Sequence, residues 1–84
     1  MVNDPLLNEL KALALACAKE MDENCSIHDF RMTKGETNIN LIFDLVLPAG
    51  YPLKNAEAAK LLSEKIKGKD NRCNCVIRAE HPFI

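Results

Sequence analysis

Two histidines carry most of the chemistry that this sequence offers. His28 precedes Asp29 one third of the way along the chain, and His81 follows Glu80 near its end. His28 and Asp29 are neighbours on a predicted strand and would point to opposite faces, so this pair alone is weak evidence for a metal site. A packed or interface histidine is the alternative interpretation of His28.

Four cysteines, Cys17, Cys25, Cys73 and Cys75, form the second group of candidate ligands. The N-terminus lacks the basic region and apolar block of a secretory signal peptide. We therefore expect reduced thiols rather than a disulfide framework. Cys73 and Cys75 share one face of a predicted strand and lie about 6 to 7 Å apart along it, within reach of one metal ion. Zinc sites normally carry their cysteines at loop spacings, so buried packing against helices is the favoured interpretation of this pair.

Composition excludes several function classes. The sequence has no serine elbow, no glycine-rich phosphate loop and no zinc-protease helix motif, so we expect no enzyme activity. Its net charge is −1, which provides no basic footprint for nucleic acid or for an anionic membrane surface. No apolar run approaches the roughly 20 residues that span a bilayer, so we expect no direct membrane insertion.

Two helices are predicted to support these residues. Asp4 is a suitable N-cap and Pro5 a suitable first residue for a helix of four to five turns. Asn55 is the predicted cap of a second helix that ends near Lys67 and Gly68. Apolar residues recur in both segments at spacings of three and four, as expected for helices packed on a sheet: Leu6, Leu10, Leu13, Cys17 and Met21 in the first, and Ala59, Leu62 and Ile66 in the second.

The segment Ser26 to Pro48 predicts two antiparallel strands around a turn at Gly35. Strict alternation would place His28 on the packed side of the first strand. One face of that strand would hold Ser26, His28, Phe30 and Met32, and the other Ile27, Asp29, Arg31 and Thr33. In the second strand the same alternation gives a core face of Ile39, Leu41, Phe43, Leu45 and Leu47.

A last strand is predicted from Cys73 to His81. The order helix, strand, strand, helix, strand predicts an α+β fold, an αββαβ two-layer sandwich of ferredoxin-like or metallochaperone-like type. Both helices would cover one face of a three-stranded sheet. If the strands that carry His28 and His81 are antiparallel neighbours, the two histidines meet at one edge of the sheet.

The face of the sheet without helices is a predicted homodimer interface. It would expose Ile42, Val46 and Val76, with Ile27 beside them. Apolar patches of this kind mark interfaces, although scattered aliphatic residues on an antiparallel face are also ordinary. Both interpretations stay open at the level of sequence.

The sequence resembles the cytosolic C-terminal domain of cation diffusion facilitator (cation efflux) transporters, which exchange zinc, iron, manganese or related divalent cations for protons. The resemblance rests on the element order, on Ile27-His28-Asp29-Phe30, on the glycine turn before a long apolar strand, and on Glu80-His81-Pro82 near the end. Ser26 stands where the family has glycine. Phe43, Ala59 and Ala79 stand where metal-binding members carry histidines.

The resemblance implies that residues 1–84 form a single cytosolic domain at the cytoplasmic side of the cell membrane. Its implied partners are a second copy of the chain and the transmembrane domain of the same transporter. Its implied cofactor is Zn²⁺ or another divalent cation, bound by His28 and His81 with Asp29, Glu80, Cys73 or Cys75 as further ligands. The alternative is a free-standing small regulatory module that binds a metal or another ligand.

Overall fold

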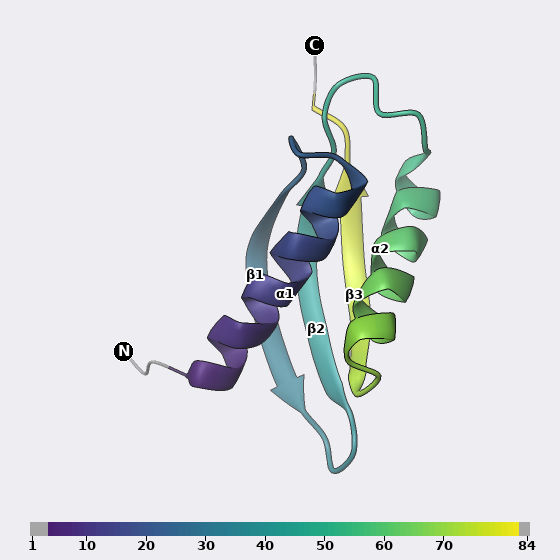
Figure 1. Cartoon of the computed structure of the whole chain (residues 1–84). Coiled ribbons are helices and arrows are strands. Elements are labelled where there is room, and N and C mark those ends of the chain that lie inside the picture. Colours follow the sequence, from purple (N-terminus) through teal and green to yellow (C-terminus); the bar gives the residue numbers. More distant parts are fainter. Residues whose placement is uncertain (1–3, 83–84) are drawn as a thin grey trace.

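Two helices lie against one face of a three-stranded sheet (Figure 1). The computed structural model describes residues 4–82. The strand order is β1-β2-β3, with β1 antiparallel and β3 parallel to the central β2. This arrangement confirms the predicted αββαβ sandwich. The elements are α1 (Pro5–Met21), β1 (Ser26–Lys34), β2 (Ile39–Val46), α2 (Asn55–Lys69) and β3 (Cys73–Glu80).

Capping fixes where each helix begins. The Asp4 carboxylate accepts hydrogen bonds from the backbone N–H groups of Leu6 at 3.0 Å and Leu7 at 3.3 Å, which confirms the predicted start of α1. Such a cap stabilises a helix by about 1 kcal/mol. The predicted cap of α2 is wrong by one residue, because the cap is Lys54 and Asn55 is already helical. The Lys54 backbone N–H donates to the Glu57 carboxylate at 3.1 Å, so the third helical residue supplies the acceptor.

The odd-numbered face of β2 is the centre of the core, as predicted. Helix α1 adds Leu10 and Ala14 to this core, and α2 adds Leu62 and Ile66. Among residues 4–82, no helix is long and apolar enough to cross a membrane. The five buried β2-face side chains are Ile39, Leu41, Phe43, Leu45 and Leu47, and none exposes more than 6% of its surface.

A β-bulge in β1 overturns the predicted alternation of that strand. His28 pairs with Asp44, and the next pair is Arg31 with Ile42, so two residues of β1 lie opposite Phe43 alone. The first of these two, Asp29, has φ = 55°, the left-handed conformation that the first residue of a G1-type bulge adopts.

The bulge shifts the residues that follow it to the other side of the strand. Ile27 and Phe30 both pack against the core, although strict alternation separates them. His28 is exposed on the open face, so its predicted position on the packed side is wrong. Ile27 likewise does not belong to the open face. The corrected grouping sets Ile27, Phe30 and Met32 toward the helices and leaves Ser26, His28, Arg31 and Thr33 on the open face.

Replacing a buried β2 residue tests how far the fold depends on this strand. Leu45 is fully buried, so we expect Leu45→Ala to lower the free energy of unfolding by about 2–5 kcal/mol through lost burial and a residual cavity. The matched control is Leu15→Ala on α1, where the leucine is 38% exposed and the expected loss is below about 1 kcal/mol. Urea unfolding followed by circular dichroism measures both. Equal losses in the two variants would contradict the assigned core.

Candidate functional site on the open face of the sheet

Charged side chains cross the open face from one strand to the next. Asp44 on β2 lies beside Arg78 on β3 in the strand register, and the Arg78 Nε donates to the Asp44 Oδ1 at 3.3 Å. The Arg78 side chain is 83% exposed, so this ion pair is well solvated and contributes about 0.2–1 kcal/mol. His28 lies across from Asp44 on the other side. In the strand register, Asp44 therefore lies between His28 and Arg78.

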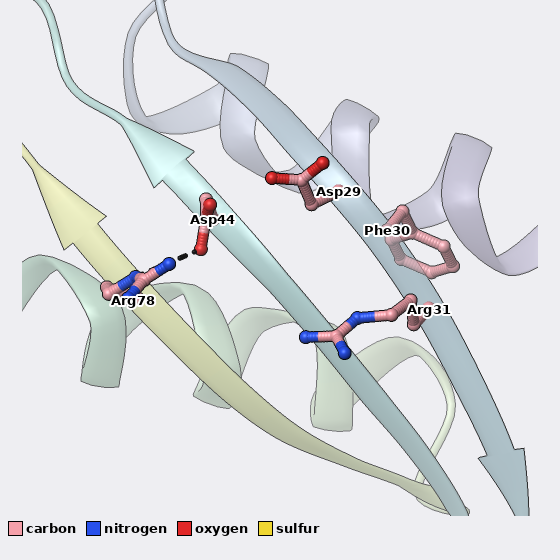
Figure 2. Close-up of a pocket in the computed structure, with 5 residues that line it drawn as sticks. All are labelled: Asp29, Phe30, Arg31, Asp44 and Arg78. Carbon is pink, nitrogen blue, oxygen red and sulfur yellow. Dashed lines mark hydrogen bonds and ion pairs between the residues drawn. The ribbon is translucent and has the colours of Figure 1, made fainter.

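A depression of about 510 Å³ lies among these charges, lined by Asp29, Phe30, Arg31, Asp44 and Arg78 (Figure 2). Strand β1 contributes Asp29 and Arg31, and both side chains reach from that strand toward β2 (Figure 2). Within the described part of the chain, the side chains of Asp29 and Arg31 make no hydrogen bond and no ion pair. The depression thus offers one free carboxylate and one free guanidinium to a ligand or a partner.

The residues of the predicted interface lie next to this depression. Ile42 and Val76 are direct neighbours in the register of β2 and β3, and both line a second hollow of about 270 Å³. Val76 is 64% exposed, and it and Leu15 are the exposed large hydrophobic residues among residues 4–82. Val46 lies further along β2, between Ser26 and Glu80. That a second chain covers Ile42, Val46 and Val76 remains a prediction.

The two histidines occupy separate environments. His28 Nε2 lies 3.2 Å from the Ser26 hydroxyl on the open face. His81 lies past the end of β3, with Nδ1 2.6 Å from Asn55 Oδ1 and Nε2 3.3 Å from the Tyr51 carbonyl oxygen. Strand β2 separates β1 from β3, so the two strands are not the antiparallel neighbours that would bring both histidines to one edge.

The candidate metal ligands do not converge within one chain. Between residues 4 and 82 there is no group of three or more histidine, cysteine or acidic side chains placed to hold a metal ion. Asp29 is on β1 and Glu80 is at the end of β3, on opposite sides of the central strand. Ligation by His28 or His81 therefore stays a prediction, and it requires donors from outside this chain.

All four cysteines are free thiols, and their surroundings favour packing over metal binding. Cys73 and Cys75 lie beside Ile39 and Leu41 in the register and pack with the core. Burial, followed by the neighbouring Cys73 and Cys17, raises the pKa of Cys75 to about 11 from the ordinary 9.0. Burial also raises the pKa of Cys17, Cys25 and Cys73. Metals bind thiolates, so raised thiol pKa values oppose ligation by these residues.

Sequence reasoning missed the charged group on the open face. Arg31 and Arg78 were not among the candidate residues, and Asp44 was not paired with either. Asp44 interrupts an otherwise apolar β2, which is a usable signal. Its pairing with Arg78 follows only from the parallel register of β2 and β3, and the position of His28 on the same face only from the bulge.

The fold is the one found in solved C-terminal domains of transporters, and this match confirms the fold that the resemblance to cation diffusion facilitator transporters implies. A variant of the MamM C-terminal domain superposes with a TM-score of 0.76 at 13% identity, covering 96% of this chain and all of that one. The candidate zinc transporter CzrB matches with a TM-score of 0.72 at 15% identity, over 98% of this chain and 100% of the other.

A third solved structure, the metal-bound C-terminal domain of the CzcD transporter from Thermotoga maritima, has a TM-score of 0.74 at 12% identity and covers 94% of each chain. At these identities the likeness establishes the fold. Comparison with protein-family models and with curated proteins gives no match.

The raised pKa of Cys75 predicts a thiol that reacts slowly in the folded chain. With a pKa of about 11, only about 0.1% of the thiol is ionised near pH 8, against about 10% for a thiol with the ordinary pKa of 9.0. We expect iodoacetamide to label Cys75 at least about tenfold more slowly in the folded chain than in urea, as measured by peptide mass spectrometry. Equal rates in the two states would contradict the assigned burial.

The same shift has a defined effect on stability. The folded chain keeps the Cys75 proton to a higher pH than the unfolded chain does, so this contribution is fully present below pH 9 and is lost as the pH rises from 9.0 toward about 11. In Cys75→Ala this part of the alkaline loss should disappear.

Proposed function

We propose that this chain is the cytoplasmic C-terminal domain of a divalent-cation/proton antiporter that exports zinc, iron or manganese. The observation that carries the proposal is the match of the whole fold to transporter C-terminal domains over 94–98% of this chain in the three structures described above. The histidine-aspartate start of β1 and the Glu80-His81-Pro82 ending support it from the sequence. The transport step itself belongs to the transmembrane part of the protein.

In this proposal the domain acts by joining two copies of the transporter. The open face supports such a role, because it combines the exposed Val76 with Ile42, Val46 and a mixed set of charges. The domain's partners are then a second copy of the chain and the transmembrane domain to which it is attached, at the cytoplasmic side of the membrane. Nucleic acid has no part in this function, and neither does catalysis.

A metal ion enters the proposal as a ligand shared between two copies. One chain alone offers His28 on the open face with carboxylates on either side of it, Asp29 next in sequence and Asp44 across the strand pair. Two copies facing each other double this set, which then includes enough nitrogen and oxygen donors for Zn²⁺. His81 is held by Asn55 and Tyr51, so it must exchange those hydrogen bonds to become a ligand.

The coding sequence tests the transporter assignment. We expect the reading frame upstream of the codon for Met1 to encode about six apolar segments of roughly 20 residues each, the length that spans a bilayer. Sequencing of the genomic region and of the transcript gives the answer. An in-frame stop codon immediately upstream would refute the assignment and would favour the free-standing regulatory module.

Zinc titration tests whether metal binding depends on pairing. Zn²⁺ at about 100 times its Kd stabilises a native state that alone binds it by about 2.7 kcal/mol. We expect this stabilisation, measured by thermal melting, at protein concentrations where the chain is dimeric, and no stabilisation where it is monomeric. The control is His28→Ala, which should abolish the effect. A shift of equal size in the monomer, or one that survives in a His28→Ala and His81→Ala double variant, would contradict a shared site.

A further inference from the structure

Asp29 and Arg31 lie two residues apart on β1, carry opposite charges and have no ionic partner within residues 4–82. We propose that they pair with each other between two copies of this chain, Arg31 of one copy with the partner's Asp29 and the reverse. The proposal rests on the homodimer of the proposed function and specifies how the two chains are aligned in it. It places the two-fold axis of the dimer between these two residues.

The spacing of Asp29 and Arg31 along β1 permits this pairing. Two residues along a strand are separated by about 6–7 Å, and both side chains reach toward β2 above the same depression (Figure 2). Consider a two-fold axis that lies in the plane of the interface, perpendicular to β1, and passes over the midpoint between the two residues. This axis places Asp29 of each copy opposite Arg31 of the other copy. Each guanidinium then faces the other copy's carboxylate, so both pairs form together, as a self-complementary interface requires.

The other charges on the face permit this approach. Asp44 and Arg78 already compensate each other within one chain. With Asp29 and Arg31 the depression carries two acids and two bases, so two copies meet without net repulsion. Ile42 and Val76 lie beside the depression and add apolar contact.

A second copy also fits this surface better than a small zwitterion does. A zwitterion would engage the same two charges, but Asp29 and Arg31 are both exposed, and exposed ion pairs are weak. A second copy covers the charges and the neighbouring apolar side chains at the same time, and burial of apolar surface adds to the affinity.

Charge reversal tests the pairing directly. In Arg31→Glu, an acid faces the partner's Asp29 at both contacts, and in Asp29→Lys, a base faces the partner's Arg31. We expect each variant alone to be monomeric at micromolar concentrations where the unchanged chain is a dimer. An equimolar mixture of the two should form a heterodimer, because both contacts then regain opposite charges. Sedimentation velocity and native mass spectrometry measure these states.

Asp29→Asn is the milder variant, and it guards against misfolding. Asparagine tolerates the positive φ of this position, so the bulge is retained while the charge is lost. Loss of two exposed ion pairs should raise the dimer Kd by about 2- to 30-fold. The Kd of the variant should also depend less on NaCl concentration than that of the unchanged chain. Salt screens ion pairs, and the variant lacks the two pairs that salt would weaken in the unchanged dimer.

The outcomes separate the pairing from the dimer. An unchanged chain that is monomeric at high micromolar concentration overturns the dimer and the pairing with it. A dimeric unchanged chain whose Kd is unaffected by Arg31→Glu and by Asp29→Asn overturns the pairing alone, and so does a mixture of folded reversal variants that stays monomeric. Monomers that heterodimerise on mixing support it.

Discussion

Burial of one face of β2 is the constraint on which the rest of the structure depends. This strand is central, with β1 on one side and β3 on the other, and both helices pack over its odd-numbered side chains. Each fully buried aliphatic or aromatic side chain contributes about 1.5–3 kcal/mol. A domain of 84 residues has few such positions, so this strand cannot change register without losing most of the core. The even-numbered side chains must then face away from the helices, and Asp44 is among them.

The bulge in β1 follows from the same constraint. Without it, Ile27 and Phe30 would point to opposite faces, and one of them would leave the core. With it, Phe30 stacks on Phe43 at a ring distance of 5.5 Å, an arrangement worth about 0.5–1.5 kcal/mol beyond burial. The opposing cost is the positive φ of Asp29, of order 1–3 kcal/mol for a residue other than glycine and smaller for aspartate, which tolerates this conformation. Burial of Phe30 and the stacking together offset that cost.

The elements themselves were predictable because each rests on local chemistry. The Asp4 cap, the apolar stripe of α1 and the alternation of β2 each depend on residues that are close in sequence, and the structure confirms all three. The bulge was not predictable from strict alternation, because its cause is the contact between Phe30 and Phe43, which are distant in sequence. The spacing of three between Ile27 and Phe30, with an aspartate between them, is the signal that a strand pattern allowing for bulges would use. Every error about His28 and Ile27 stems from that one inserted residue.

The resulting charge arrangement bears on how a cation could act on this face. Asp44 is the carboxylate nearest in register to His28, and the guanidinium of Arg78 already donates to it. An arginine is charged at every physiological pH, so its positive charge stays available to Asp44 across that range. A metal ion that used the same carboxylate oxygen would have to displace the guanidinium, whose side chain is largely solvated and therefore free to move. A dimer built on this face would consequently need no metal to form, and a bound cation would adjust an interface that arginine already keeps electrically neutral.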